Sequence, residues 1–503
     1  MTVSHTSPGT EAGDAAPADG TVLPDGAAEV PGTRAAADPS AAAAGEKKEK
    51  EKDGAEGADQ AEKPLLRNLD FQALWTSEAF AALAKETAEV AYPLLILSST
   101  GSAFYAGAVG SAQLITASLM SIPGGTLADR MDRRLLMIVC NLVRVVLLGL
   151  FSLLVFTDHT HPALIFTVAV GSAVCLGISN PTGLAAIKQL VPASQLTQAT
   201  AQNQIRYFAA TMGGPPVGGT LFGVARAFPF LSAAIGFLIS TVLLLFIRKP
   251  MKVEQAAPGE KRNTAEGFRI LGRQPVLRLL IVWIMGSNMA FTHSGVFLAL
   301  IATAESRGAS AGFTGMLLSI AGIGGLVGSL IAGPVIKKVA PSTLFLAAAW
   351  IGPVAAVLLA NVSGLIPLGI IVACVFLRGP ITSALFLAYL AAMVPDKAQG
   401  RVLGAVMFMS MIAAPVGVFA IGTVFDTAGP VWVFTVMAVV SGLAALPTLS
   451  PRIRKLAPPE AYADTATVAD TAAPAPGGSA PATPGSAAAA PASDDQPQQG
   501  DPR

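Results

Sequence analysis

Long runs of apolar residues separated by short polar breaks dominate the chain from Leu65 onward. A helix rises about 1.5 Å per residue, so about 20 residues cross the roughly 30 Å hydrocarbon core of a bilayer. The pattern predicts twelve membrane-spanning helices. Their approximate extents are 72–98, 103–127, 134–156, 162–186, 199–224, 228–247, 276–302, 311–335, 342–360, 364–393, 402–424 and 430–449.

The polar breaks predict the orientation of these helices. An even number of spans places both termini on one side, and cytoplasmic loops collect Lys and Arg. In one set of breaks, the only basic residues of the Lys and Arg type are Arg226 and Arg307. The other set is therefore expected to be cytoplasmic, with both tails. It contains Arg130, Arg133, Arg134, Lys188, Arg248, Lys249, Lys252, Lys261, Arg262, Lys337, Lys338, Lys397 and Arg401.

The two ends of the chain differ in composition from its middle. Residues 1–64 are rich in Ala, Gly, Pro, Glu and Lys, and residues 456–503 in Ala, Pro, Ser and Gly. Such segments bury too little apolar area to offset chain entropy, so both are expected to be disordered cytoplasmic tails. The longest internal break predicts a cytoplasmic linker at 248–275 between six-helix bundles at 65–247 and 276–455.

Matching positions in the two halves indicate a repeat. Gly125, before the basic turn of the first half, corresponds to Gly333 before Lys337 and Lys338. Pro216-Val217-Gly218 corresponds to Pro415-Val416-Gly417. We therefore expect an all-α membrane protein built from two pseudo-symmetric bundles.

Composition and motifs exclude several protein classes. Of 503 residues, 52% are hydrophobic and 13% charged, which indicates a protein embedded in lipid, with no nucleic-acid partner. Cys140, Cys175 and Cys374 lie in apolar runs without metal-ligand or disulfide spacing, so neither metal nor cofactor is expected. No His-Glu-x-x-His, Gly-x-Ser-x-Gly or Gly-Lys-Ser/Thr motif is present, which argues against an enzyme and against direct ATP drive.

The turn between the second and third runs carries a recognisable motif. Its sequence Gly125-x-Leu127-Ala128-Asp129-Arg130-x-x-Arg133-Arg134 resembles the signature loop of the major facilitator superfamily. Asp132 replaces the usual Gly, as in the drug- and siderophore-exporter branch that includes enterobactin exporters. The resemblance covers residues 65–455 and implies a substrate site near the midplane between the two bundles.

The resemblance also implies a gating role for this turn. The family's counterpart of Asp129 lies near the N-terminus of span eleven, where the helix dipole favours an anion. Arg130, Arg133 and Arg134 are expected to hold neighbouring acids and lipid phosphates. Contacts of this kind bridge the bundles only when the cytoplasmic side is closed. The turn also acts as a topology signal.

Span five contains a second motif. Gly214-Pro215-Pro216-Val217-Gly218-Gly219 resembles the Gly-Pro-x-x-Gly-Gly motif of antiporters in this superfamily, although Ala210 stands where an upstream glycine is expected nearby. Proline removes a backbone donor and glycine allows close helix approach, so Gly214, Pro215, Gly218 and Gly219 predict a tightly packed bend. The resemblance associates that bend with export.

Span one carries an unusual number of charges. Glu78, Lys85 and Glu89 fall on one helical face, and Glu86 lies beside that face. A charge at the bilayer centre costs at least about 2.5–3.5 kcal/mol, so these groups should face the bundle interior. One lysine against three glutamates leaves an acid that can exchange a proton, which proton-coupled transport requires. The alternative is a static ion-pair network.

Other polar residues within the spans complete the candidate site. Arg144 in span three and Arg378 in span ten each need a carboxylate, backbone carbonyls or water as partners, and the acids of span one are candidates. His293 is a candidate proton or substrate site, with an ordinary interior histidine as the alternative. Asn180 and Asn288 are candidate ligands for a substrate.

These features favour a secondary active exporter that moves an amphiphilic small molecule against protons. We expect a monomeric, multi-pass protein of the plasma membrane whose partners are the substrate, protons and the lipid bilayer. A nutrient importer is the alternative within the same fold. A non-transporting sensor or scaffold, or a membrane enzyme, is less favoured.

Overall fold

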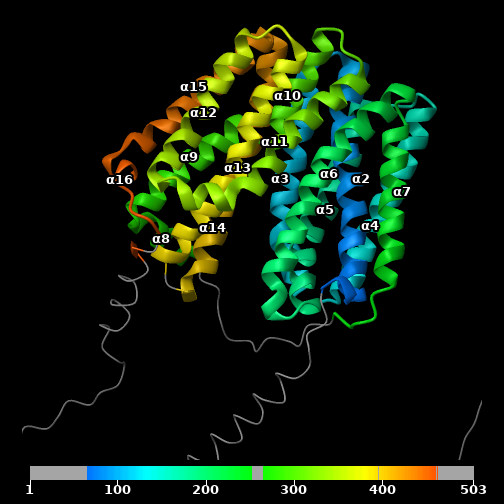
Figure 1. Ribbon diagram of the computed structural model, residues 1–503. Coiled ribbons are helices and arrows are strands. Elements are labelled where there is room, and N and C mark those ends of the chain that lie inside the picture. Colours follow the sequence, from blue (N-terminus) through cyan, green and yellow to red (C-terminus); the bar gives the residue numbers. More distant parts are fainter. Residues whose placement is uncertain (1–64, 252–263, 395, 460, 463–503) are drawn as a thin grey trace, which may run out of the picture. The chain divides into compact units, whose positions relative to one another are not determined.

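The computed structural model describes residues 65–251, 264–394, 396–459 and 461–462, and all regular structure in these residues is helical (Figure 1). The long helices of the first half are α2 (Leu69–Thr100), α3 (Ala103–Ala128), α4 (Arg133–Phe156), α5 (Pro162–Leu190), α6 (Leu196–Val224) and α7 (Phe228–Leu245). Those of the second half are α9 (Pro275–Phe291), α10 (His293–Ser306), α11 (Ala311–Lys338), α12 (Pro341–Asn361), α13 (Leu365–Met393), α14 (Asp396–Ala428) and α15 (Pro430–Ala445). Short helices are η1 (Leu65–Arg67), η2 (Ala193–Gln195), α8 (Thr264–Arg273), η3 (Leu446–Leu449) and α16 (Pro451–Arg454).

Every predicted apolar run coincides with one of these long helices, and the seventh run forms two. Thr292, with φ −62° and ψ 146°, interrupts that run between α9 and α10. Among the described residues, ten segments are long and apolar enough to cross a membrane, with α9 and α10 counted as one. Polar residues within α2 and α6 keep these two helices out of that set. The all-α expectation is confirmed.

The expected linker contains a helix. Within residues 248–275, α8 packs on α14, with Gly267 against the Arg401 carbonyl and the ring of Phe268 6.1 Å from that of Phe408. The rest of the linker, residues 252–263, lies outside the described residues, as does the N-terminal segment 1–64.

Packing continues past Lys455 into the segment expected to be a tail. Leu456 is buried, and the ring centroid of Tyr462 lies 6.1 Å from that of Tyr389 on α13. The remainder of that segment, from residue 463 on, is not described.

Side-chain caps set several helix starts. Asn68 Oδ1 accepts the Phe71 N–H at 3.1 Å to begin α2, and Ser310 Oγ accepts the Phe313 N–H to begin α11. Such caps satisfy backbone donors that the first helical turn leaves unpaired. Proline, which fits the first turn of a helix, begins α5, α9, α12, α15 and α16.

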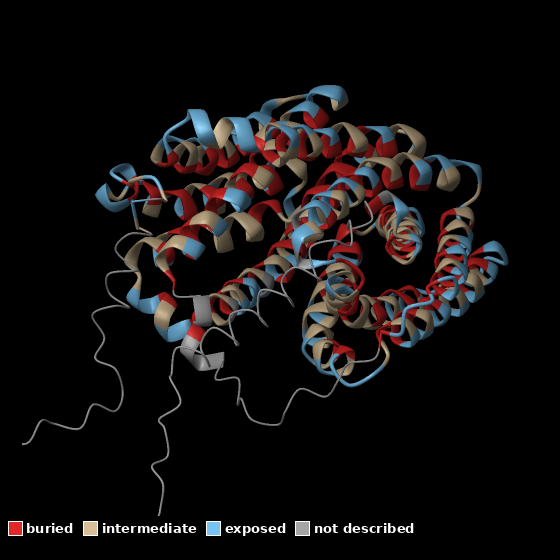
Figure 2. Cartoon of the chain, turned by 60° about the horizontal axis from the view of Figure 1, so that its bottom comes forward, coloured by how far each residue is buried: buried red, intermediate tan, exposed pale blue. Residues whose placement is uncertain are grey.

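The outward helix surfaces are apolar. On α4, Leu142, Val146, Leu150 and Leu153 are exposed, whereas the opposite side is buried against neighbouring helices. Figure 2 shows the same division, with buried positions on the sides of the helices that face one another. An exposed apolar surface of this extent is stable only against lipid.

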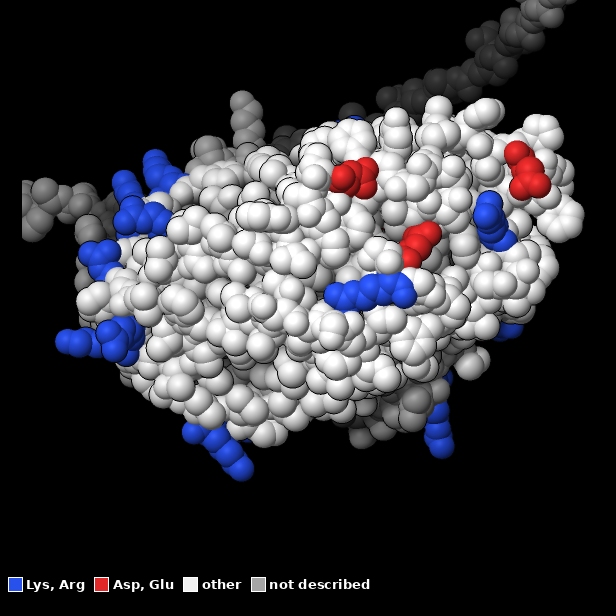
Figure 3. Space-filling model, turned by 90° about the horizontal axis from the view of Figure 1, so that it is seen from above, with Lys and Arg blue, Asp and Glu red and all other residues white. Residues whose placement is uncertain are grey.

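The two halves share one hydrophobic core at one end only. At the end where α3 begins, a single cluster joins Tyr92 and Val109 of the first half to Leu300 and Val418 of the second. We call this the outer end, because its loops are those expected outside. Figure 3 views this end from the top of Figure 1, and uncharged residues cover most of it.

Toward the opposite end, which we call the inner end, each half has its own core. One cluster contains Phe71 and Met137 of the first half, and a separate cluster contains Phe345 and Tyr389 of the second. The structure is therefore closed between the bundles at the outer end and divided at the inner end.

Two helix pairs close the outer end. In the first pair, α3 packs on α14 so closely that a Cβ at Gly107 would lie 3.0 Å from the Gly422 Cα. In the second, α6 packs on α11, where Gly315 lies against the Pro215 carbonyl. Only glycine permits backbone approaches of this kind.

Asp426 of α14 strengthens the first pair by capping the neighbouring helix. Its carboxylate accepts hydrogen bonds from the Ser102 hydroxyl, from the Ala103 N–H at 2.7 Å and from the Phe104 N–H at 3.0 Å. These groups form the N-terminus of α3, where the helix dipole also favours an anion. A side chain of the second half thus caps a helix of the first half.

We predict that Asp426→Ala destabilises the closed outer end. Loss of an N-cap acceptor costs about 0.5–2 kcal/mol, so the purified variant should unfold at lower temperature than the wild-type protein. The measurement is thermal unfolding in detergent, with Asp158→Asn, a change at an exposed outer acid, as the control. Equal melting of the Asp426 variant and the control would show that the cap contributes nothing.

Candidate functional site

The charges of α2 form a cluster around Lys85. Its Nζ lies 2.9 Å from Glu86 Oε1 and 3.3 Å from Glu89 Oε1. Glu89 therefore belongs to the cluster. Glu86 lies beside the charged face, as predicted, and Lys85 nevertheless pairs with it, because the flexible lysine side chain reaches its neighbour in sequence. The Glu86 side chain is only 3% exposed.

His293 adds a contact from the other half. Its Nε2 lies 3.3 Å from Glu86 Oε2. The break at Thr292 makes His293 the first residue of α10, and its ring packs 4.0 Å from Phe297 and 5.8 Å from Phe376. The structure thus brings together two candidate residues that are 207 positions apart in the chain.

Glu78 has a separate partner. Arg206 Nη1 of α6 lies 2.9 Å from Glu78 Oε2, and Gly183 of α5 lies beside the same carboxylate. Sequence analysis missed Arg206, although an arginine within an apolar run is the signal that singled out Arg144 and Arg378. Among the described residues, neither of those two arginines forms an ion pair with an acid of span one, so that candidate pairing is not made.

Arg378 has its hydrogen-bond partners within the second half, except for its Nε, which has none. Its Nη1 donates to the Ala348 carbonyl at 3.0 Å and to Ser287 Oγ at 3.3 Å, and its guanidinium lies 5.8 Å from the Phe291 ring centroid. Backbone carbonyls can therefore stabilise a buried arginine without a carboxylate.

Arg144 on α4 is differently placed. It is 4% exposed, and its guanidinium lies 4.9 Å from the Phe237 ring centroid. Nε and Nη2 have no hydrogen-bond partner. The other two candidates lie apart from the cluster: Asn180 is exposed on α5, and Asn288 is partly buried on α9.

A polar cavity adjoins the cluster. Its empty space is about 540 Å³, including the opening to solvent, and an adjacent pocket shares Glu89, Tyr92, Gln113 and Ser294 with it. Ser294 is on α10, so both halves contribute to its wall. The full lining is Lys85, Ala88, Glu89, Tyr92, Gly110, Gln113, Leu114, Ala117, Arg144, Leu148, Ser172, Ala173, Leu176, Phe237 and Ser294. This is the candidate binding site.

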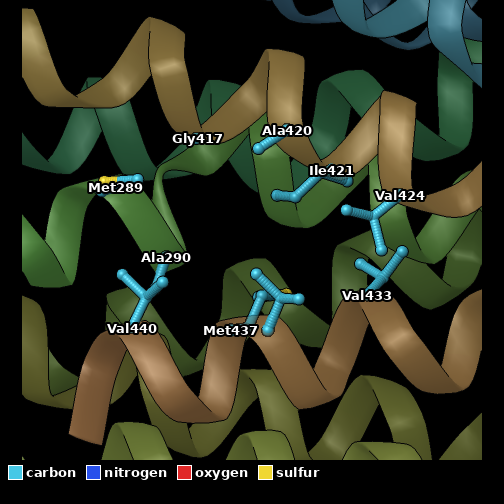
Figure 4. A pocket seen from close by; sticks show the side chains of 10 residues that line it. Met289, Ala290, Gly417, Ala420, Ile421, Val424, Val433, Met437 and Val440 are labelled. Atoms are coloured by element: carbon cyan, nitrogen blue, oxygen red, sulfur yellow. The ribbon is translucent and has the colours of Figure 1, made fainter. Parts of the chain in front are cut away.

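A second crevice lacks the groups needed for polar chemistry. Figure 4 shows Met289 and Ala290 of α9 facing Ile421 of α14 and Met437 of α15, and every side chain that lines the crevice is apolar. It can accommodate hydrocarbon and offers neither charge nor hydrogen bonds.

The cluster also contains a possible metal-ligand set among the described residues. One ligand atom each from Glu86, Glu89 and His293 lies within 4.8 Å of the others. Lys85 Nζ, however, already lies 2.9 Å and 3.3 Å from the two carboxylates. The ammonium therefore already occupies the position of a cation beside the two carboxylates.

The basic turn between α3 and α4 caps helices. Asp132 Oδ1 accepts the Arg134 N–H at 2.9 Å and so begins α4, which is a physical reason for an acid where the family pattern has glycine. Arg134 donates to the Leu244 and Leu245 carbonyls at the end of α7. Arg133 donates to the Ala128 and Ala185 carbonyls.

Asp129 is the predicted gating residue of this turn. Its Oδ1 lies 3.9 Å from Arg133 Nη2, and both Asp129 and Arg130 are exposed. Among the residues whose side chains are described, no ion pair joins Asp129 to the second half. Gly125 has open space beside its Cα.

The glycines of the span-five motif bring α6 against two helices. A Cβ at Gly214 would overlap Glu86 Cβ, and one at Gly218 would lie 2.7 Å from the Thr87 carbonyl oxygen of α2. Gly219 lies against the Ala311 carbonyl of α11. The motif therefore borders Glu86, a member of the charged cluster.

The prolines of the motif expose a carbonyl that α11 uses. Pro216 has no N–H to donate to the Met212 carbonyl one turn earlier, and Ser319 Oγ of α11 donates to that carbonyl at 2.9 Å. The predicted bend is thus tied to the second half by a hydrogen bond as well as by Gly219.

Comparison with known proteins assigns the chain to a family. The model for the "Major Facilitator Superfamily" matches residues 74–383 and, in a second match, residues 287–486. The chain belongs to the Major Facilitator Superfamily. Members of this family are transporters, so the predicted transporter fold and class are confirmed.

Three similar proteins agree with this assignment. The multidrug efflux pump Tap of Mycolicibacterium fortuitum is 24% identical over 388 residues, which are 73% of this chain and 92% of that protein. The multi-drug resistance efflux pump PmrA of Streptococcus pneumoniae is 26% identical over 53% of this chain and 66% of PmrA. The structure of the nucleoside transporter NupG is similar with a TM-score of 0.59 at 15% identity, over 78% of this chain and 99% of NupG.

The repeat expected of a Major Facilitator Superfamily protein is visible in specific contacts. Gly218 of α6 lies against the Thr87 carbonyl of α2, and Gly417 of α14 lies against the Met289 carbonyl of α9. These two glycines occupy matching positions in the two halves of the sequence. The same glycine contact thus holds span five on span one and span eleven on span seven.

We predict that Gly214→Ala disturbs the Glu86 environment. The added methyl group would overlap Glu86 Cβ, and overpacking of this kind costs about 1–3 kcal/mol. Folded protein, measured by size-exclusion chromatography, and transport per folded molecule should both fall. The control is Gly223→Ala on the same helix, where nothing lies within 4 Å. Equal behaviour of the two variants would refute the packing argument.

Proposed function

We propose that this protein is a proton-coupled exporter of amphiphilic small molecules. Two relatives that are named as multidrug efflux pumps, and the span-five motif that resembles that of antiporters, support export. The cavity, with apolar walls and few charges, suits an amphiphile better than a sugar. A nutrient importer is the alternative, and the direction of gradient-driven transport distinguishes the two.

The observation that carries the coupling proposal is the contact between Glu86 and His293. Glu86 is buried, belongs to the first half and is held by Lys85, whereas His293 belongs to the second half. A buried carboxylate needs such partners, since an unpaired ion in the interior costs several kcal/mol. Movement of one half against the other therefore changes the partners of this acid.

Alternating access supplies that movement. The bundles share a core at the outer end and are divided at the inner end, so this structure is open toward the inner side. Opening the outer end separates α10 from α2 and removes His293 from Glu86. Proton binding to Glu86 then replaces the lost partner, so the proton and the outward-open state favour each other.

The orientation of this cycle follows the distribution of charge. We propose that the inner end is cytoplasmic, that both termini lie there, and that the protein is a monomer in the plasma membrane. The basic residues of the inner loops support this orientation, because cytoplasmic loops collect Lys and Arg. Arg133, Arg134 and Lys249 all lie at the inner end, where they donate to backbone carbonyls.

Transport by reconstituted protein tests the proposal. In proteoliposomes with an imposed pH gradient, the protein should move a hydrophobic fluorescent substrate in the direction opposite to proton flow. The substrate should therefore accumulate on the side from which the protons come. Glu86→Gln keeps size and hydrogen bonding but cannot titrate, so it should still exchange substrate down its gradient and lose the response to pH. The readout is substrate accumulation with and without the pH gradient.

The matched control is Glu305→Gln, at the outer end of α10 and away from the cluster, which should retain coupling. Wild-type protein that moves substrate with the same rate at every pH gradient contradicts proton coupling. Full pH-driven accumulation by Glu86→Gln would instead place the coupling site elsewhere, with Glu89 and Glu78 the next candidates.

The turn between α3 and α4 yields a separate prediction. If Asp129 stabilises the state in which the inner end is closed, Asp129→Asn should insert normally, transport more slowly and favour the inner-open state. The change is followed by the labelling rate of Ile122→Cys on α3 with a soluble maleimide, in a background in which Cys140, Cys175 and Cys374 are replaced by Ala. Asp129→Glu keeps the charge and serves as the control. Unchanged transport and labelling in Asp129→Asn would contradict the gating role.

A further inference from the structure

Arg144 presents an unused binding edge. Its Nε and Nη2 have no hydrogen-bond partner, although the residue is only 4% exposed. These two donors lie on the same edge of the guanidinium plane. That edge binds two oxygens of a carboxylate side by side, with two parallel charge-assisted hydrogen bonds.

The surroundings of Arg144 do not neutralise its charge. None of the ion pairs formed by the described residues includes it. Its recorded contact is the Phe237 ring, which is a weaker partner for a cation than a carboxylate. Arg378, the comparable buried arginine, has a carbonyl and a hydroxyl partner instead. Arg144 therefore has a stronger demand for an anionic acceptor.

Arg144 borders the polar cavity, although its Nε and Nη2 are themselves buried, so an acceptor from the cavity reaches that edge when the guanidinium turns toward it. Arg144 lines the cavity together with Gln113 and Ser172, and with Tyr92, whose buried hydroxyl also has no hydrogen-bond partner. Glu89 lines the same cavity and carries a charge opposite to that of Arg144. Apolar side chains fill the rest of the lining, which suits the body of an amphiphile.

We propose that Arg144 anchors a carboxylate, or an equivalent pair of adjacent anionic oxygens, on the exported amphiphile. The proposal rests on the proposed efflux function and narrows its substrate class to acids and zwitterions. The carboxylate binds the Nε and Nη2 edge, the Tyr92 hydroxyl donates an additional hydrogen bond, and an amine on a zwitterion faces Glu89.

A matched pair of dyes tests this subsite. Tetramethylrhodamine carries a free carboxylate, and its methyl ester differs by one methyl group that blocks it. Fluorescence anisotropy with purified protein measures both affinities. The wild-type protein should bind the acid about tenfold more tightly than the ester, the size expected for one charge-assisted pair.

Two variants locate the effect. Arg144→Lys keeps the charge but lacks the planar edge, so the ratio of acid to ester affinity should fall toward one while ester binding persists. Arg378→Lys alters a buried arginine that does not line this cavity, and it should keep the wild-type ratio. A wild-type ratio near one, or an unchanged ratio in Arg144→Lys, overturns the proposal.

Efflux of the same dyes from proteoliposomes separates this proposal from the one on which it rests. Acid-selective binding that depends on Arg144, without transport of either dye, supports the subsite and contradicts the efflux function. Transport of both dyes with equal affinities supports efflux and overturns the subsite. If Arg144→Lys fails to fold, the wild-type ratio decides: a value near ten supports the proposal, and a value near one overturns it.

Discussion

The cost of placing four charged side chains of α2 inside a membrane bundle constrains the rest of this structure. Burial of an ion is tolerated only when partners replace its hydration. Lys85 supplies one partner for two glutamates, Arg206 of α6 serves Glu78, and His293 of α10 reaches Glu86. Three helices are thereby bound to one another by charge, and one of them belongs to the opposite half. The groups suited to coupling therefore lie where the two halves meet.

Close packing makes these contacts possible. Gly214 allows α6 to approach the backbone at Glu86, and Gly219 and Gly315 allow the same helix to approach α11. A larger side chain at either place would widen the spacing by more than the tolerance of a hydrogen bond. The antiporter-like motif thus has a physical connection to the acid cluster. It sets the distance between the helix that holds the acid and the half that holds the histidine.

The sequence predicted the helices well, since a run of about 20 apolar residues in lipid has few alternatives to a helix. It also predicted the charged face of span one and the repeat seen at Gly218 and Gly417. Pairings were harder to predict. Helical periodicity places Glu86 off the lysine face, yet the flexible Lys85 stem lets its ammonium bind both acids. Arg206 was missed because pairing depends on which helices are neighbours, and periodicity within one helix carries no such information.

The pair α3 and α14 offers a physical reason for two stable states. At the outer end, Asp426 of α14 caps the N-terminus of α3. The two helices begin at opposite ends, and Asp129 follows the last residue of α3 at the inner end, the end at which α14 begins. An acid is thus available at each end to stabilise the start of the opposite helix. Because the bundles are joined here at the outer end and divided at the inner end, one cap is made while Asp129 remains exposed.

A rocking motion that exchanged one cap for the other would replace a helix-terminus contact with one of the same kind. Neither state would then be strongly favoured, and a proton or a bound substrate could decide between them.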